Sequence, residues 1–358
     1  MIHHAAPARV GILGNPSDGY GGRTLALAVQ QFEASVTLEP AEGIELVGAP
    51  DDDPCWPSLA AMTDHVDRHG YGTGPQLLAA TVRTFASVAA SLGIPMDEGC
   101  RLQYRTSIPR QVGLGGSSAL VVATLRCLCE HYGMTVPSMI LPSIALSVET
   151  DQLGISAGLQ DRVVQTYGGL VAMDFGDAVV DTRFGVSHGT YEPVDPSALP
   201  PLFLAFRESA AEPSTDYHRQ LRARFDAGDS AVRDTLRELA ALVIEGRAAL
   251  RWGDGARFGA LIGRNMTLRR SLGPLPEAQL ELVDVAESLE THATFAGSGG
   301  AVVGCFTDAD HAEELADAYA DIGADFAVID ATASSVVAAL TDDEPDDSNV
   351  VALQPRRG

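Results

Sequence analysis

The chain has 358 residues, of which 46% are hydrophobic and 20% are charged, a composition typical of a folded protein long enough for two hydrophobic cores. Its net charge of −24 repels nucleic-acid phosphates and anionic lipids, which excludes those partners. All 24 lysine-plus-arginine residues are arginine, which excludes a Walker A loop, because that loop binds phosphate through a lysine.

The N-terminal half predicts short strands and helices in turn. Period-two alternation predicts strands over residues 9–14, 36–38, 44–47 and 101–105. Helical periodicity with Pro and Gly boundaries predicts helices over 75–93, 117–131 and 159–167, and a further helix running toward Glu149. The segments 170–175 and 179–183 predict a hairpin that turns at Gly176 and Asp177.

The C-terminal half begins at a proline-rich stretch. Pro193, Pro196, Pro200 and Pro201 mark a domain boundary, which predicts domains over residues 1–195 and 196–340. Helical periodicity runs from 216 to 289, and a glycine cluster at 297–300 precedes a strand over 301–306, a helix over 309–322 and a strand over 326–329. Residues 341–358 have no core pattern and are predicted to be a disordered tail.

Two negative signals concern the compartment. No apolar run is long enough to span a bilayer, and the N-terminus lacks a basic patch followed by an apolar core. No pair of the five cysteines has metal-ligand spacing, so we read them as free thiols in a reducing environment. Both signals predict a cytoplasmic protein with no membrane partner.

The strongest chemical signal is the segment 109–119, Pro-Arg-Gln-Val-Gly-Leu-Gly-Gly-Ser-Ser-Ala. Its glycines allow the backbone to turn its amides inward, and the helix that follows adds unpaired N–H groups and the positive end of its dipole. This predicts an anion site suited to a triphosphate, with hydroxyls of Ser117 and Ser118 where a bridging Mg²⁺ would bind. The alternative is a Gly-Ser turn that only caps a helix. The predicted binding residues are Pro109, Gly113, Leu114, Gly115, Gly116, Ser117, Ser118 and Ala119.

Two acids follow this segment. Glu149 lies near a helix end, and Asp161 stands in Gly-Leu-Gln-Asp-Arg. In a phosphate site, one carboxylate can hold Mg²⁺ and the other can deprotonate an attacking hydroxyl. The alternative is that both are surface acids in an acidic chain.

Two glycine-rich turns complete the pattern. The turn over 14–22 carries Ser17 and Asp18, which could reach sugar hydroxyls, and Arg9 on the preceding strand could face phosphate. The turn over 296–300 could closely approach a substrate, or the other glycine-rich loop, through Gly297, Ser298 and Gly299. Each turn alone could equally be an ordinary loop.

These four segments resemble, in order and in role, the motifs of the GHMP kinase superfamily. The resemblance covers the chain from Pro7 to about Ile329. Several stretches are similar to the glucuronokinases within it, including residues 14–24, 108–119, 158–170 and 297–303. Thr294 and Ala296 depart from the third motif, which often has Lys and Thr there. Asn15 and Pro16 stand where galactokinases have an acid and a histidine, which argues against galactose.

The resemblance implies an α+β fold of two domains, an N-terminal ribosomal-S5-like domain and a C-terminal ferredoxin-like domain, with the active site in the cleft between them. It implies an ATP- and Mg²⁺-dependent kinase that phosphorylates the anomeric hydroxyl of a sugar acid, with D-glucuronate as the best candidate. Asp161 is then the base and Arg9 stabilises the moving phosphoryl group. Ser117, or Ser118, holds Mg²⁺ with Glu149.

A carboxylate-bearing substrate needs a cation, and a planar arginine fork suits it best. The candidates are Arg110, Arg162, Arg269 and Arg270, each of which could equally be a surface arginine. Three alternatives stay open for the activity: a kinase of another sugar or uronic acid, an isoprenoid-pathway kinase, and a non-catalytic nucleotide-binding regulator.

Overall fold

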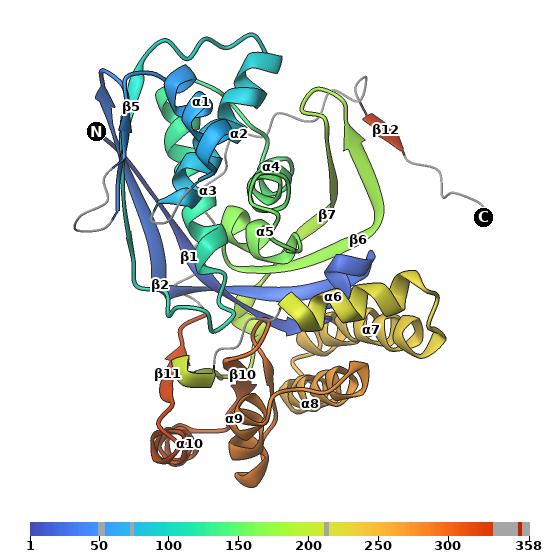
Figure 1. The fold of residues 1–358 in the computed structure, drawn as a ribbon. Helices are drawn as coiled ribbons and strands as arrows, with labels where there is room; N and C mark the ends of the chain where they lie inside the picture. The colour runs from blue at the N-terminus through green and yellow to red at the C-terminus, as the bar shows by residue number, and fades with distance from the viewer. Residues whose placement is uncertain (49–53, 72–74, 211–214, 332–349, 353–358) are drawn as a thin grey trace.

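The computed structural model describes residues 1–48, 54–71, 75–210, 215–331 and 350–352. Two sheets and their helices make up this part of the chain (Figure 1). In the described residues, no helix combines the length and the apolar character that crossing a membrane requires.

The larger sheet has the strand order β12-β6-β2-β5-β3-β4, with β1 paired to β2 and β7 paired to β6. Its strands are β1 (Ile2–Leu13), β2 (Arg23–Ala41), β3 (Ile44–Val47), β4 (Cys55–Trp56), β5 (Gly99–Thr106), β6 (Leu170–Asp181), β7 (Val186–Val194) and β12 (Val350–Ala352). Both β1 and β2 are far longer than their predicted strands. Residues 6–13 of β1 are buried without a break, so the alternation that reveals a strand with one solvated face is missing there.

One face of this sheet is covered by the helices α1–α5 (Figure 1). They are α1 (Leu59–His69), α2 (Gln76–Ser91), α3 (Gly116–His131), α4 (Leu141–Ser147) and α5 (Gln160–Tyr167). The central helix α3 packs against β1 and β2 and is flanked by α2, α4 and α5. Its ten buried residues explain why it is apolar nearly all round. At its N-terminus α3 is tied to α5, because Gln165 of α5 donates to the carbonyl of Gly115.

The smaller sheet has the order β11-β8-β10-β9. Its strands are β8 (Leu202–Phe206), β9 (Ala293–Phe295), β10 (Ala301–Cys305) and β11 (Asp325–Ile329). The helices of this half are α6 (Thr215–Asp226), α7 (Ser230–Arg251), α8 (Gly255–Leu272), α9 (Glu277–Ser288) and α10 (Ala309–Asp321). Phe203, Phe295 and Tyr319 are central in a core between sheet and helices.

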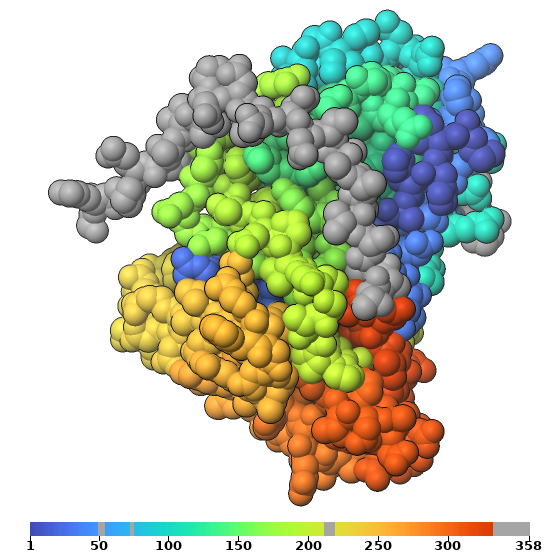
Figure 2. Space-filling view, turned by 180° about the vertical axis from the view of Figure 1, so that it is seen from behind, coloured from blue at the N-terminus to red at the C-terminus, as the bar shows by residue number. Residues whose placement is uncertain are grey.

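The two halves are joined through β1, because α7, α8, β9 and β10 all contact this strand. Seen from behind in Figure 2, the residues from about 200 to 331 gather in the lower part of the molecule. The predicted α+β class is confirmed. The division at residue 196 stays a prediction.

The predicted hairpin turn at Gly176 and Asp177 is wrong. β6 continues to Asp181, and its pairing with β7 shifts register between Asp174 and Val179. A bulge uses the same residue types as a turn, which explains the error. The true turn follows Asp181, whose side chain accepts hydrogen bonds from the amides of Arg183 and Phe184, both at 2.9 Å.

The predicted disordered tail, residues 341–358, falls mostly outside the described residues. Its described part, Val350–Ala352, pairs antiparallel with β6. The sequence did not predict this strand.

Candidate active site

β1 is the strand at which the segments 109–119 and 296–300 meet. Its Arg9 amide donates to the Leu114 carbonyl at 3.1 Å, and its Gly11 amide donates to the Ala296 carbonyl at 2.7 Å. One strand therefore fixes the backbone of both the 109–119 segment and the 296–300 turn.

The two glycine-rich loops are packed directly against each other. A Cβ on Gly297 would lie 2.0 Å from the Gly113 carbonyl oxygen and 2.8 Å from Nη1 of Arg9. Gly113 itself has φ of +79° and no room for a Cβ beside Ser298. Side chains are excluded here by both space and backbone conformation, so these glycines are required for the loops to meet.

Arg9 and Asp161 form the charged centre of the site. The Arg9 side chain is 6% exposed, and its Nε and Nη2 both lie 2.6 Å from Oδ1 of Asp161. Nη1 of Arg9 donates to the carbonyls of Gly113 at 2.9 Å and Ala296 at 2.6 Å. A planar fork can bridge three such partners at once, so Arg9 links Asp161, the second residue of α5, to both loops.

The pKa values of the two aspartates of the site are shifted in opposite directions. Burial acts to raise the pKa of Asp161, but the cations of Arg9 and Arg162 outweigh it and hold that pKa below its usual range. Burial and the nearby charge of Asp161 raise the pKa of Asp18. Asp161 is therefore the ionised carboxylate at neutral pH, as a general base must be.

Glu149 is buried in the π-helical turn Val148–Gln152 that follows α4. Its Oε2 accepts a hydrogen bond from Nη2 of Arg162. Arg162 also donates to the Gly158 carbonyl at 2.6 Å, and its Nη1 lies 3.9 Å from Oδ2 of Asp161. Arg162 thus joins the two acids that the sequence singled out.

The 109–119 segment ends in two serines with different surroundings. Ser117 is exposed at the first turn of α3, whereas Ser118 is 1% exposed and donates to the Gly115 carbonyl at 2.9 Å. Only Ser117 presents its hydroxyl outward. Of the remaining predicted binding residues, Leu114 and Ala119 are buried beneath the loop and Pro109 is half-buried at its start.

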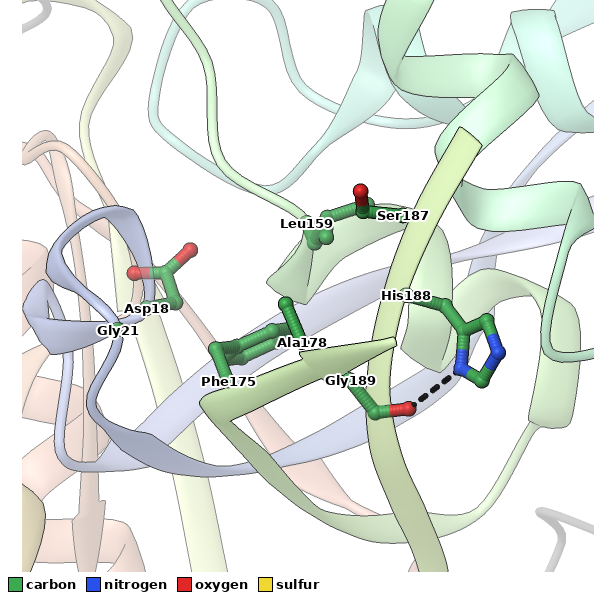
Figure 3. Close-up of a pocket in the computed structure, with 8 residues that line it drawn as sticks. All are labelled: Asp18, Gly21, Leu159, Phe175, Ala178, Ser187, His188 and Gly189. Atoms are coloured by element: carbon green, nitrogen blue, oxygen red, sulfur yellow. Dashed lines mark hydrogen bonds between the residues drawn. The ribbon is translucent and has the colours of Figure 1, made fainter. Parts of the chain in front are cut away.

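A pocket of about 130 Å³ adjoins Asp18. In Figure 3, Asp18 and the imidazole of His188 stand at opposite sides of it, with Phe175 and Leu159 between them. The His188 ring nitrogen Nδ1 lies 2.9 Å from the Gly189 carbonyl. An acid beside an apolar surface and backbone groups suits a polar ring such as a sugar.

Ser17 is a correction to the sequence prediction. Its side chain is fully buried, and its hydroxyl donates to the Arg23 carbonyl at 2.8 Å. It holds the turn together and does not face the pocket, so it is removed from the predicted substrate residues.

The four arginines considered for the substrate carboxylate lie in different places. Arg269 is also a correction: it is 1% exposed and its guanidinium lies 5.1 Å from the Phe295 ring centre, inside the second core. Arg162 is buried with Glu149, and Arg270 pairs on the surface with Asp284 at 3.0 Å. Arg110 is exposed at the start of the 109–119 segment and stays a candidate.

Sequence reasoning missed two buried amides that hold the loops. Asn265 of α8 accepts from the Gly14 amide at 2.9 Å and donates to Thr294 at 3.0 Å. Gln165 of α5 donates to the Gly115 carbonyl at 2.7 Å. Neutral amides within helices carry no charge or turn signal, although Gln165 lies in the stretch 158–170 that resembles the family.

The residues present fit Mg²⁺ as a partner of bound phosphates. Among the described residues, no group of three or more His, Cys, Asp or Glu side chains could hold a metal by itself. Mg²⁺ instead takes one or two protein oxygens together with phosphates and water. The outward hydroxyl of Ser117 and the carboxylate of Glu149 are oxygen donors of that kind.

Comparison with protein families gives two matches. The model described as "GHMP kinases N terminal domain" matches residues 70–169, and "GHMP kinases C terminal" matches residues 247–325.

Comparison with individual proteins gives longer matches. The chain is 40% identical over 309 residues to "Glucuronokinase 1" of Arabidopsis thaliana, covering 84% of both chains. It is 39% identical over 311 residues to "Probable glucuronokinase 2" of the same plant, covering 85% of this chain and 84% of that one. Among solved structures, phosphomevalonate kinase of Streptococcus pneumoniae superposes with a TM-score of 0.73 at 16% identity, covering 92% of this chain and all of that one.

Proposed function

Because the chain belongs to the GHMP kinase family, we propose that it transfers the γ-phosphoryl group of ATP to the anomeric hydroxyl of a sugar acid. The observation that carries this proposal is the ionised Asp161, held by Arg9 beside a glycine-rich loop at the N-terminus of α3. The best candidate acceptor is D-glucuronate, since the curated relatives with the longest matches described above are glucuronokinases.

ATP binds with its triphosphate on the 113–118 loop. The carbonyl oxygens of Gly113 and Leu114 face Arg9. The Gly113 oxygen accepts a hydrogen bond from Nη1 of Arg9, and the Leu114 oxygen accepts one from the Arg9 backbone amide. The N–H groups of the following residues point the opposite way, because a trans peptide directs its N–H opposite to its C=O. These amides and the positive end of α3 stabilise the negative phosphates.

Transfer begins with the acceptor. Asp161 takes the proton of the anomeric hydroxyl, and the resulting oxygen attacks the γ-phosphorus. The bond between that phosphorus and the β–γ bridging oxygen breaks, and ADP leaves with the bridging oxygen. Arg9 stands between Asp161 and the loop, where a fixed cation stabilises charge on the moving phosphoryl group.

Ser117 and Glu149 are the residues that would hold Mg²⁺. When bound, Mg²⁺ neutralises charge on the phosphate oxygens. Arg162 occupies one oxygen of Glu149, which leaves the other oxygen for the metal.

The acceptor lies between Asp161 and the pocket beside Asp18. The carboxyl group of Asp18 lines this pocket and can hydrogen-bond a sugar hydroxyl, and the backbone of Gly189 adds a polar edge. Arg110 is the remaining arginine of the four that could meet the acceptor carboxylate. We expect the reaction to take place in the cytoplasm.

The test is a coupled ADP-release assay with MgATP and a panel of acceptors: glucuronate, galacturonate, galactose and mevalonate. Selective turnover of glucuronate supports the proposal. Selective turnover of another acceptor would reject glucuronate as the substrate. Binding of ADP without turnover of any sugar or sugar acid would reject the proposed kinase activity.

A further inference from the structure

One carbonyl in the phosphate loop has an unusual number of donors. The oxygen of Gly115 accepts from Nε2 of Gln165 at 2.7 Å, from the hydroxyl of Ser118 at 2.9 Å and from the amide of Ala119 at 3.0 Å. A carbonyl oxygen has two lone pairs, so three donors crowd around it and define its direction closely.

This carbonyl continues a series. The Gly113 oxygen is held by Arg9 Nη1 at 2.9 Å and the Leu114 oxygen by the Arg9 amide at 3.1 Å. With Gly115, three successive carbonyls are bound on the protein side of the loop. Their peptide planes therefore direct three successive N–H groups, of Leu114, Gly115 and Gly116, away from the protein.

Gln165 differs from the other donors because it belongs to α5, the helix that also carries Asp161. It lies one helical turn after Asp161 on α5, so the two side chains leave the same face of that helix. A Cβ on Gly115 would lie 2.8 Å from Nε2 of Gln165 and 3.4 Å from Oδ2 of Asp161. The loop is thus in contact with both side chains at one point.

Burial of the Gln165 amide lowers the stability of the fold. It is fully buried, and its Oε1 has no hydrogen-bond partner among the described residues. An unpaired buried acceptor is destabilising, and an apolar side chain of the same size would avoid it. A polar residue kept there points to a role for its donor end.

We infer that Gln165 is a positioning residue that ties the catalytic helix to the phosphate loop. Its amide fixes the Gly115 peptide so that the Gly116 N–H faces the phosphates, and it sets the distance between that loop and Asp161. The inference rests on the proposed kinase function, but it concerns nucleotide binding and can be tested without turnover.

The first test is Gln165→Met, which keeps the volume and removes the donor. We expect the Kd for MgADP, measured by titration calorimetry, and the KM for ATP to rise about tenfold, the scale of one buried hydrogen bond. The KM for the sugar acceptor should change less than twofold, because no acceptor contact is removed.

The matched control is Thr166→Val on the same helix. Thr166 is buried and donates to the Arg162 carbonyl at 2.7 Å, so the variant also loses one buried hydrogen bond. It should bind MgADP as the wild type does. Equal losses in both variants, or unchanged MgADP binding in Gln165→Met, would overturn the inference.

A second variant keeps the test decisive if Gln165→Met folds poorly. In Gln165→Glu, the ionised carboxylate cannot donate to the Gly115 oxygen, whereas the protonated acid can. The pH at which the introduced carboxyl titrates is first measured by carbon-13 NMR of the labelled side chain. MgADP affinity of this variant, relative to wild type, should recover as the pH falls through that value. A ratio that stays constant while the carboxyl becomes protonated contradicts a donor role. Loss of turnover with these binding results intact would instead count against the proposed function.

Discussion

Replacing Arg9 with Met removes the cation on which the site is assembled. Arg9 is almost completely buried and donates to Asp161, Gly113 and Ala296 at 2.6–2.9 Å. Breaking a buried ion pair by removing one partner costs about 3–5 kcal/mol. Loss of a fixed charge next to the transferred group should lower kcat by a further factor of about 10²–10³.

The pH dependence of this variant follows from Asp161. Its folded pKa is lowered with Arg9 present, so its contribution to stability is present above the unfolded pKa and is lost as the pH falls through the folded pKa. Without Arg9 the folded pKa rises. The difference in stability between wild type and Arg9→Met should therefore shrink when the pH falls below about 4.

Urea unfolding at pH 7 and at lower pH, together with initial rates in the ADP-release assay, measures both effects. Arg9→Lys is the control, because it keeps the charge but replaces a three-way fork by one ammonium group. It should retain part of the stability and little of the rate. An Arg9→Met protein with near-normal turnover and stability at pH 7 would refute the role of Arg9.

Three further predictions concern single residues. Asp161→Asn should lower kcat by about 10³-fold or more, with MgADP binding in calorimetry changed only a few-fold; near-normal turnover would remove Asp161 as the base. Gly297→Ala forces a Cβ to 2.0 Å from the Gly113 oxygen and should destabilise the protein by about 1–3 kcal/mol in thermal or urea unfolding. Gly255→Ala, with no atom closer than 3.4 Å, should be neutral or stabilising, and equal losses would contradict the packing argument. Ser117→Ala should raise the Mg²⁺ concentration needed for half-maximal turnover several-fold, roughly as expected for loss of one supporting ligand, and an unchanged Mg²⁺ requirement would exclude this ligand.

The sequence predicted the loops well because their glycines are unusual. A cluster such as Gly113, Gly115 and Gly116 has few structural uses, and the helix predicted directly after it is present as α3. The binding of phosphate by this loop stays a prediction. The two acids Glu149 and Asp161 could be predicted as site residues only because the glycine-rich segment 109–119 precedes them.

Errors in the sequence reading arose where one residue type serves two purposes. Ser17 lies in a polar turn, and nothing in the sequence tells an outward hydroxyl from one that donates to its own loop, here to the Arg23 carbonyl. An arginine is usually exposed, but Arg269 is buried against Phe295. Tertiary packing decides both cases.

The residues that position the site were the least predictable. Gln165 donates to the Gly115 carbonyl, and Asn265 bonds the Gly14 amide and the Thr294 hydroxyl, all of which are far away in sequence. No local pattern marks such contacts, because they exist only once β1, α5 and α8 are packed together.

The proposed reaction transfers phosphate from ATP to the anomeric oxygen of a sugar acid. Incubating the protein with MgATP and D-glucuronate, and analysing the product by proton–phosphorus NMR, shows directly which oxygen is phosphorylated. We predict one phosphorylated product in which phosphorus couples to the anomeric proton. Phosphorus on any other carbon, or no phosphorylated product, would contradict the account.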